Sequence, residues 1–344
     1  MTTTESTPAS SSPTLDEVAR LAGVSRATAS RAINGGTRVS PRAQAAVAAA
    51  VRTLGYSPNP AARSLVTRRT DSIALVVPEP DDRVFSDPFF AGTLRGVSRV
   101  LTEHDLQMVL LLAQPGPASE RTLRYLRGRH VDGALITSHH RDDRLAGRMA
   151  GIGLPCVFGG RPWSDSERVT YVDVENVAGG RLAATALLER GCRSIATITG
   201  PLDMTAAVDR LDGWREALAA AGVRHDRVVN GDFTFEGGER ATRELLAAHP
   251  DIDGIFAASD LMASAALSVL AETGRRVPDD VAVVGFDDIG GAERTSPPLT
   301  TLRNPVTEMA EQMTRMLLQQ IHGQAAATPV RLVMPTRLVR RQSC

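Results

Sequence analysis

The chain has 344 residues, among them 39 basic and 39 acidic side chains, so its formal net charge is zero when histidine is neutral. It is longer than an ordinary single domain, and no apolar run is long enough to cross a bilayer as a helix, so we predict a multidomain protein without membrane spans. Three scattered cysteines fit a reducing cytoplasm, and the sequence has no metal-ligand spacing, phosphate-binding glycine loop or nucleophile motif, so we predict neither a metal, a cofactor nor an enzyme.

The neutral total conceals two stretches of opposite charge. Residues 14–69 contain nine arginines and two acidic residues, a net charge of +7, whereas residues 70–344 sum to −6. A strongly basic segment favours the phosphate backbone of DNA, which repels an acidic remainder. Residues 1–13 are polar and rich in serine and threonine, so they are predicted to be a disordered tail rather than a signal peptide.

The first helix signal begins at Thr14. Apolar residues recur with the spacing of one helix face from Leu15 to Ala22. Thr14 and Glu17 have the spacing of a capping box, in which each side chain accepts a hydrogen bond from the backbone of the other. Gly23 favours a sharp end to this helix, because glycine adopts a positive φ without strain.

A second helix is predicted directly after this turn. Ser25 is a suitable N-cap, and Ala29, Ala32 and Ile33 share the inner face of the helix, which Asn34-Gly35-Gly36 then ends. Two short helices separated by a glycine turn are typical of a helix-turn-helix, whose second helix lies in the major groove of DNA.

The outer face of the second helix carries Arg26, Ala27, Ser30 and Arg31. An arginine can donate two hydrogen bonds to guanine, and an alanine can contact the methyl group of thymine. Arginines on an exposed face can also be merely solvated, but the groove-facing position and the local charge favour base contacts. The candidate DNA-contacting residues of this region are Thr14, Ser25, Arg26, Ala27, Thr28, Ser30, Arg31, Asn34, Tyr56, Asn59, Ala62, Arg63 and Leu65.

A third helix is predicted to begin after Ser40, with Pro41 in its first position and Gly55 beyond its end. In the segment that follows, Asn59 is a suitable N-cap for a short helix that ends near Leu65. So short a helix is marginal in water, so it should form only against DNA or its symmetry mate. We place a DNA-binding domain at 14–57, a hinge helix and linker at 58–71, and a ligand-binding and dimerisation domain at 72–344.

From residue 72 onward, short apolar runs alternate with helical stretches. The predicted strands are 73–77, 108–112, 133–136, 195–198, 254–257 and 281–285, with helices such as 179–190 and 211–221 between them. This alternation predicts doubly wound parallel sheets, which bind ligands beyond the carboxyl ends of their strands. The segment is too long for one such sheet, so we expect two similar subdomains that face a cleft.

Candidate cleft residues lie where predicted strands end or helices begin. Asp287 follows an apolar strand, Arg210 precedes a predicted helix, and Phe89 and Phe90 lie at another helix start. An arginine can bind hydroxyl or acid groups through its planar set of donors, and an aromatic ring can stack on a ligand ring. The two phenylalanines could instead belong to the core, and Asp287 could cap a helix.

Tandem histidines, His139 and His140, precede Asp142 and Asp143 and are the nearest approach to a metal-binding cluster in the sequence. Such short matches are often accidental. We therefore predict a solvated loop at this position rather than a metal site.

Several segments together resemble the lactose-repressor (LacI/GalR) family of bacterial transcription regulators: TLDEVARLAGVSRATASRAIN, SPNPAARSL, VDVENVAGGRLAATALLERG and VPDDVAVVGFDD. The resemblance covers the chain after about the first dozen residues. It implies a periplasmic-binding-protein fold for the body, with crossings between subdomains near Arg161–Asp173 and near Asp288–Thr300. It also implies that a pair of Leu65 side chains wedges the minor groove at the centre of a near-palindromic operator.

The same resemblance implies roles in the cleft. It implies that Arg210 and Asp287 bind a small-molecule effector, and it extends the candidate effector site to Phe89, Phe90, Arg161, Trp214 and Ser259. One departure is Gly160, which stands where the family usually has an aspartate before the arginine. The identity of the effector is therefore left open.

The predicted fold is an all-α helix-turn-helix head followed by an α/β periplasmic-binding-protein-like body of two doubly wound subdomains. The predicted function is a homodimeric, sequence-specific repressor of carbohydrate-utilisation genes that binds operator DNA and a small sugar in the cytoplasm, on the nucleoid. A regulator of the same family that senses a purine or nucleoside is an alternative. A solute-binding protein is a second alternative, but such a protein does not need the basic N-terminal domain.

Overall fold

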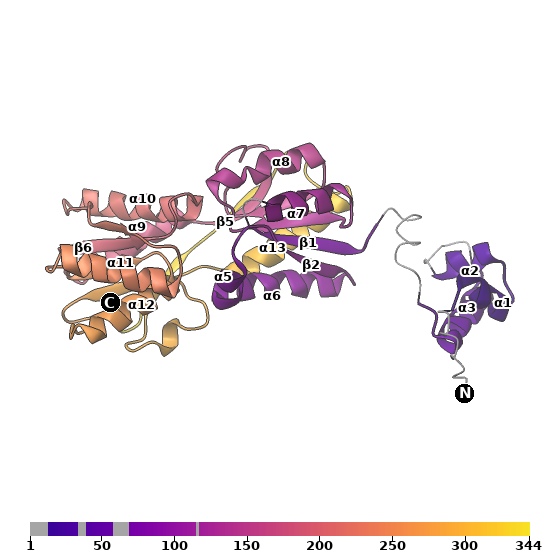
Figure 1. Cartoon of the computed structure of the whole chain (residues 1–344), viewed down its shortest axis with the longest axis horizontal. Coiled ribbons are helices and arrows are strands. Elements are labelled where there is room, and N and C mark those ends of the chain that lie inside the picture. The colour runs from indigo at the N-terminus through magenta and orange to yellow at the C-terminus, as the bar shows by residue number, and fades with distance from the viewer. Residues whose placement is uncertain (1–12, 34–38, 58–68, 115–116) are drawn as a thin grey trace, which may run out of the picture. The chain divides into compact units, whose positions relative to one another are not determined.

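The computed structural model describes residues 13–33, 39–57, 69–114 and 117–344, and the chain divides into two compact units between Thr70 and Asp71 (Figure 1). The first unit contains the helices α1 (Leu15–Ala22), α2 (Arg26–Ile33) and α3 (Pro41–Leu54). Their small core is centred on Val18, Ala29 and Val47, which are almost fully buried.

The local signals of the first unit form as predicted. The backbone nitrogen of Glu17 donates to Thr14 Oγ1 at 3.3 Å, and the backbone nitrogen of Thr14 donates to Glu17 Oε2 at 2.7 Å, which completes the capping box. Gly23 and Gly55 end α1 and α3 with φ values of 64° and 63°. Ser40 caps α3, because its hydroxyl accepts from the backbone of the third helical residue. The helix-turn-helix prediction is confirmed in its described parts.

The second unit begins with a subdomain built on a six-stranded parallel sheet, here called the first subdomain. Its strand order is β11-β5-β4-β3-β1-β2. The strands are β1 (Ser72–Val77), β2 (Gln107–Leu112), β3 (Gly133–Thr137), β4 (Cys156–Gly159), β5 (Thr170–Val174) and β11 (Arg331–Met334). Helices α6 (Pro88–Glu103) and α13 (Val306–Ile321) cover one face, and α7 (Pro117–Arg127) and α8 (Leu145–Ile152) cover the other. The short α5 (Asp81–Ser86) precedes α6.

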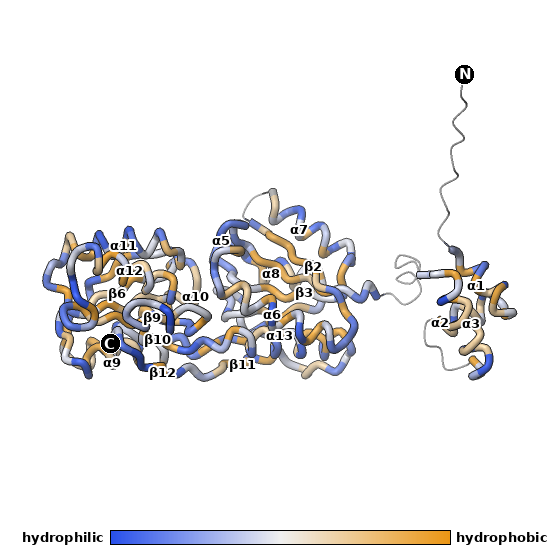
Figure 2. Tube along the Cα trace, turned by 90° about the horizontal axis from the view of Figure 1, so that it is seen from below, coloured by the Kyte–Doolittle hydropathy of each residue, from blue (hydrophilic) through white to orange (hydrophobic). Residues whose placement is uncertain are grey.

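The second subdomain repeats this plan around another six-stranded sheet, of order β12-β10-β9-β8-β6-β7. Its strands are β6 (Ile195–Thr199), β7 (Val228–Asn230), β8 (Gly254–Ala257), β9 (Ala282–Asp287), β10 (Thr300–Arg303) and the antiparallel β12 (Arg337–Val339). Helices α9 (Asn176–Glu189) and α10 (Thr205–Ala220) cover one face, and α11 (Phe235–Ala248) and α12 (Asp260–Glu272) the other. Figure 2 shows apolar residues gathered in the strands and polar ones on the outer helices. Two doubly wound subdomains are thus confirmed.

The chain crosses between the subdomains at different places from those predicted. Within the described residues there are three crossings: at Glu175 between β5 and α9, at Asn304–Pro305 between β10 and α13, and at Pro335–Thr336 between β11 and β12. The predicted crossings, Arg161–Asp173 and Asp288–Thr300, are therefore wrong. Each placed the change of subdomain one strand too early, because β5 and β10 still pair within the sheet they follow. The third crossing joins two very short strands, which gave no sequence signal.

No helix in the described part of the chain is long and apolar enough to cross a membrane.

Candidate DNA surface and ligand cavity

Helix α2 presents an exposed basic face. Arg26, Ala27 and Arg31 are all exposed on it. Arg26 Nε lies 3.4 Å from Asp16 Oδ1, and Arg31 Nε donates to the carbonyl of Ala27 at 3.1 Å. An ion pair between two exposed side chains contributes little to stability, so Arg26 can exchange Asp16 for another partner at low cost. The face suits contact with base edges or phosphates.

The other predicted DNA contacts in this unit have partly structural roles. The hydroxyls of Ser25 and Thr28 lie 2.9 Å apart, and Ser25 Oγ accepts from the backbone of Thr28 at 3.1 Å, so both belong to the N-cap of α2. Thr14 caps α1, while Ser30 and Tyr56 are half-buried. The predicted contacts that lie outside the described residues are Asn34, Asn59, Ala62, Arg63 and Leu65, and with them the hinge helix. All of these DNA contacts remain predictions.

Replacing Arg26 with alanine should relax sequence preference at one base pair of the operator. Loss of a bidentate guanine contact costs about 1–3 kcal/mol of binding free energy at that position only. The measurement is fluorescence anisotropy on a panel of operators with single substitutions. Arg52→Ala, an exposed change on α3, is the control. Equal weakening on every operator would assign Arg26 to a phosphate instead.

The second unit contains a cavity between its two subdomains, at the carboxyl ends of the strands. It encloses about 860 Å³ of space, counting the part open to solvent. Side chains from the ends of β3, β4, β5 and β9 and from the loop after β8 line it, which is where ligands bind on such sheets. Its polar lining includes Arg83, Asp87, Thr137, Ser138, His139, Asp173, Asn176, Thr205, Arg210, Ser259, Asp287 and Asn304.

Arg210 is the central cation of the cavity and is only 5 % exposed. Its Nε donates to Asn176 Oδ1 at 2.9 Å, and its Nη1 donates to the carbonyl of Ala258 at 2.5 Å. The guanidinium lies 3.6 Å from the ring centre of Phe286, and Nη2 is 4.0 Å from Asp287 Oδ1. Burial lowers the pKa of Arg210, and neighbouring carboxyls oppose this effect. The guanidinium is thus fixed in orientation before any ligand arrives.

Arg210 does not precede a helix, as we predicted, but lies inside one. Helix α10 begins at Thr205, and no side chain caps its start. The predicted start, just after Arg210, was wrong because no capping residue marks the first turn. Close packing of α10 on α9 then holds the arginine in place: a Cβ atom on Gly213 would lie 1.9 Å from the carbonyl oxygen of Val177. Only glycine permits this approach.

Asp287 lies at the end of β9 with a φ of 131°, a strained backbone conformation for a residue with a side chain. Its Oδ1 accepts from Asn304 Nδ2 at 3.1 Å. Burial raises the pKa of Asp287 to about 8, although the charge of Arg210 opposes the rise. A carboxyl group at this position can accept a hydrogen bond from a ligand hydroxyl, and in its protonated form it can also donate one.

The cavity also has an apolar part to its lining. Phe89 and Phe233 line the cavity together with Val306, Met309 and Met313. Phe233 has a φ of 66° and packs directly on Gly200, where a Cβ atom would lie 2.0 Å from the ring. A pyranose ring has apolar faces and a polar edge, so a cavity lined by both apolar and polar side chains suits a sugar.

Four predicted effector residues line the cavity: Phe89, Arg210, Ser259 and Asp287. The other three do not line it. Phe90 is buried in the core of the first subdomain and meets Phe89 edge to face, because consecutive helical residues point in different directions. Trp214, one turn after Arg210, is fully buried in the second subdomain.

The third of these residues, Arg161, forms an ion pair instead. Its Nη2 donates to both carboxylate oxygens of Asp209, at 2.6 and 2.7 Å, and so joins the two subdomains beside the cavity. This ion pair engages Nη2 of Arg161. Arg161, Phe90 and Trp214 thus lie outside the lining of the cavity, and their roles in effector binding stay predictions.

Several lining residues were missed in the sequence. Asp173 is the penultimate residue of β5, an acidic residue between two valines near the carboxyl end of a strand, and this signal could have identified it. Asn176 and Asn304 lie at the first two crossings between subdomains, and Asn304 Oδ1 is buried without a hydrogen-bond partner in the described structure. Arg83 and Asp87 lie around α5, where nothing in the sequence distinguishes them from surface residues.

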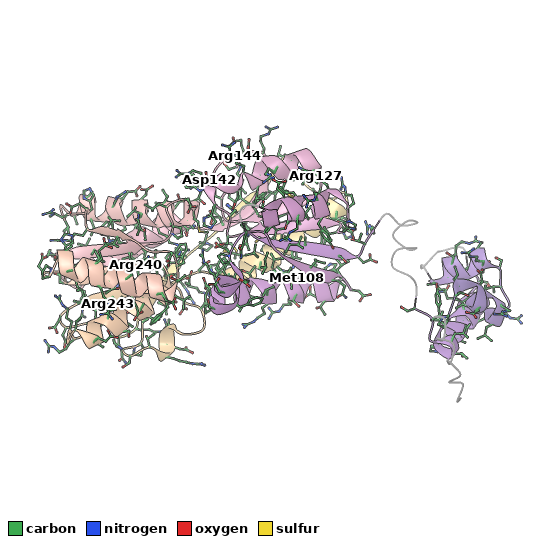
Figure 3. The ribbon with its side chains drawn as sticks, in the orientation of Figure 1. Met108, Arg127, Asp142, Arg144, Arg240 and Arg243 are labelled. Carbon is green, nitrogen blue, oxygen red and sulfur yellow. The ribbon has the colours of Figure 1, made fainter. Side chains whose placement is uncertain are left out.

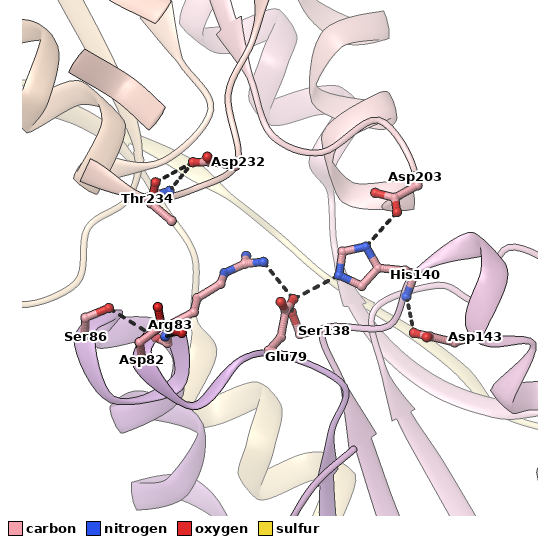
Figure 4. Close-up of polar contacts among 10 residues, drawn as sticks. All are labelled: Glu79, Asp82, Arg83, Ser86, Ser138, His140, Asp143, Asp203, Asp232 and Thr234. Carbon is pink, nitrogen blue, oxygen red and sulfur yellow. Dashed lines mark hydrogen bonds and ion pairs between the residues drawn. The ribbon is translucent and has the colours of Figure 1, made fainter. Parts of the chain in front are cut away.

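The tandem histidines are not solvated, contrary to our prediction. His139 is buried and lines the cavity, and burial lowers its pKa to about 4. His140 lies between two carboxylates, Glu79 and Asp203 (Figure 4). The loop is ordered because it ends β3 at the interface between the subdomains. The described residues contain no group of three or more side chains that could hold a metal ion.

Two family models match the chain. Residues 14–59 match the model described as bacterial regulatory proteins, lacI family. Residues 184–344 match the model of a periplasmic binding protein-like domain.

Similar proteins extend along almost the entire chain. The HTH-type transcriptional regulator CelR of Thermobifida fusca is 52 % identical over 96 % of this chain and 98 % of its own length. The ribose operon repressor of Escherichia coli K12 is 35 % identical over 90 % and 93 %. A solved CelR–cellobiose complex covers 96 % of this chain and all of its own, with 50 % identity and a TM-score of 0.78. The lac repressor dimer bound to operator and an anti-inducer has 26 % identity and a TM-score of 0.86, covering 97 % and 99 %.

Proposed function

This chain belongs to the lacI family of bacterial regulatory proteins, and we propose that it is a homodimeric repressor whose operator affinity responds to cellobiose or a similar neutral disaccharide. As a member of the family it is a DNA-binding transcription regulator. The proposal concerns the ligand, the dimer and the repressor role, exercised at a near-palindromic operator in the cytoplasm.

The chemistry of the cavity supports a neutral polyol. Its lining combines aromatic and aliphatic side chains with a fixed guanidinium and the carboxyl groups of Asp87, Asp173 and Asp287. Burial raises the pKa of each of these three carboxyls. A phosphate or carboxylate ligand would meet several acidic groups and one cation, whereas sugar hydroxyls can donate to the carboxyl oxygens and accept from Arg210.

The relatives support the same ligand class. The relative at 52 % identity is a CelR, and a CelR has been solved with cellobiose. Ribose operon repressors are also similar along nearly the full chain. The purine or nucleoside alternative is not favoured, because the HTH-type transcriptional repressor PurR of Serratia proteamaculans is 32 % identical, against 52 % for CelR. A solute-binding protein does not need a DNA-binding domain of the lacI type, so this alternative is not favoured either.

Isothermal titration calorimetry of the full chain tests this function. We expect cellobiose to bind with one site per chain, because all the side chains that line the cavity belong to the same chain. Operator DNA followed by fluorescence anisotropy should be released as cellobiose is added. Guanine and hypoxanthine serve as controls and should give no heat. Binding of a purine without binding of cellobiose would overturn the proposed ligand class.

A further inference from the structure

Three side chains from separate loops form a chain of hydrogen bonds across the cleft, beside the cavity. His140 Nε2 lies 3.1 Å from Glu79 Oε1, and His140 Nδ1 lies 2.9 Å from Asp203 Oδ2 (Figure 4). Glu79 follows β1 and His140 follows β3, both in the first subdomain, whereas Asp203 lies between β6 and α10 in the second. The imidazole thus joins the two halves of the body.

The geometry requires a doubly protonated ring. A carboxylate oxygen only accepts hydrogen bonds, so both ring nitrogens must carry hydrogen for both contacts to be favourable. A neutral imidazole has one N–H, which leaves a lone pair facing the other carboxylate. Burial alone lowers the pKa of His140, but Glu79 and Asp203 outweigh it and raise the pKa to about 9. The histidine is an imidazolium at neutral pH.

The surrounding groups reinforce Glu79 as an acceptor. Glu79 is buried, and its Oε1 also accepts from Ser138 Oγ at 2.5 Å and forms an ion pair with Arg83 Nη1 at 2.8 Å. Arg83 in turn lies 5.6 Å from the ring centre of Phe233, in the second subdomain. The carboxylate is therefore held in place on the side of the first subdomain.

The remaining charged groups near the ring are Asp143, His139 and Arg141. Asp143 Oδ2 accepts from the backbone nitrogen of His140 at 2.7 Å. His139 is buried, and its pKa of about 4 leaves it neutral. The guanidinium of Arg141 lies over the ring of Trp163, at 4.1 Å from its centre. The imidazolium is thus faced by three carboxylates and by no other charged imidazole.

The loop of Asp203 is held by the first subdomain through its backbone as well. The carbonyl of Asp203 accepts from the backbone nitrogen of Arg141 at 2.9 Å and from Trp163 Nε1. Thr205, at the start of α10, donates to the carbonyl of Arg161 at 2.6 Å. These contacts place the loop so that its carboxylate meets His140 when the cleft is closed.

We propose that Glu79, His140 and Asp203 form a charge-dependent latch that holds the two subdomains closed over the effector and slows effector release. The effector role of the cavity rests on the proposed function. His140 is a positioning residue: it lies outside the lining of the cavity and acts by stabilising the closed arrangement in which Arg83 and Arg210 line the same space. A ligand that binds only the closed arrangement gains affinity in proportion to the population of that arrangement.

The first test compares His140→Gln and Asp203→Asn with the full-length wild type, using cellobiose as the probe. Loss of a charge-assisted hydrogen bond in a partly buried site should raise the dissociation constant about tenfold at pH 7, mainly through faster dissociation. Asp142→Asn is the matched control, because Asp142 is exposed on the same loop (Figure 3). The control should stay within about twofold of wild type.

The pH dependence separates the latch from a merely structural role. Because the pKa of His140 is raised in the folded protein, its contribution is present at neutral pH and is lost as the pH rises through about 9. The titration of Asp287, whose pKa is raised to about 8, affects wild type and His140→Gln alike, so the latch is read from the ratio of their dissociation constants, which should be about tenfold at pH 7 and close to one at pH 10. An equal gap between the two proteins at both pH values would overturn the proposal.

The latch can also be tested without a ligand, so the proposal stays testable if cellobiose does not bind. The melting temperatures of wild type, the two single variants and the double variant form a double-mutant cycle at pH 7. The effects of the two substitutions should be strongly non-additive, and the coupling should vanish at pH 10. Additive effects at pH 7 would overturn the latch, whereas absence of cellobiose binding by wild type alone would overturn only the proposed effector.

Discussion

Replacement of Arg210 with leucine is expected to abolish the response to cellobiose while leaving operator binding intact. The guanidinium is buried, bonded to Asn176 and to the carbonyl of Ala258, and stacked on Phe286. Its removal leaves these acceptors and Asp287 without a cation, and breaking a buried charged contact costs about 3–5 kcal/mol. In calorimetry the affinity for cellobiose should fall by about 100-fold or more. Operator anisotropy should remain at the wild-type level, because the substitution lies in the other compact unit.

Two further variants serve as comparisons for Arg210→Leu. Arg210→Lys should lose almost as much affinity for cellobiose, because an ammonium group cannot reproduce the two fixed donors or the stacking on Phe286. Arg215→Ala, an exposed change on the same helix, should bind cellobiose like wild type. Wild-type affinity in Arg210→Leu would show that the ligand lies elsewhere, and a large loss in Arg215→Ala would show that α10 as a whole is sensitive.

The second large effect concerns the contact between α9 and α10. A methyl group on Gly213 would lie 1.9 Å from the carbonyl oxygen of Val177, which is backbone and cannot move away without shifting α9. Gly213→Ala should therefore lower the free energy of unfolding of the body by roughly 3 kcal/mol, at the upper end of the range for overpacking. Because α10 carries Arg210, affinity for cellobiose should fall as well. Urea unfolding followed by circular dichroism measures the first effect.

Gly151→Ala is the matched control for this substitution. Gly151 lies in α8, has no heavy atom within 4 Å of an added Cβ and does not need a positive φ. Alanine is favoured over glycine in a helix by about 1 kcal/mol, so this variant should be as stable as wild type or slightly more stable. If Gly213→Ala unfolded at the same urea concentration as Gly151→Ala, the close approach of the two helices would be refuted.

The sequence predicted those parts of the fold that depend on neighbours in the chain. The capping box at Thr14, the glycine ends at Gly23 and Gly55 and the buried strands are local signals, and the structure has them. The crossings between subdomains were misplaced because they depend on which sheet a strand joins. That choice is made by tertiary packing, which no spacing of residues encodes.

The candidate site was predicted only in part, because it also depends on tertiary packing. Arg210 and Asp287 lie on the cavity, as expected from strand ends and family resemblance, but Trp214 does not. Trp214 lies four residues after Arg210, on the same side of α10, but its ring packs into the core of the second subdomain, a tertiary contact that helix spacing does not reveal. His140 was wrongly predicted to be solvated because its partners, Glu79 and Asp203, are about 60 residues away in the chain.

The three crossings also determine when each half of the body can be completed during synthesis. Helix α13 covers β3 and β4 of the first sheet, yet it follows almost the whole second sheet in the chain. Strand β11 completes the first sheet later still, and β12 completes the second directly afterwards. A ribosome releases residues in chain order, so the apolar surface of Leu135 and Val157 stays uncovered until α13 emerges. Both halves of the body therefore reach their final form almost together, within residues 306–339, although the first half begins to emerge at residue 71.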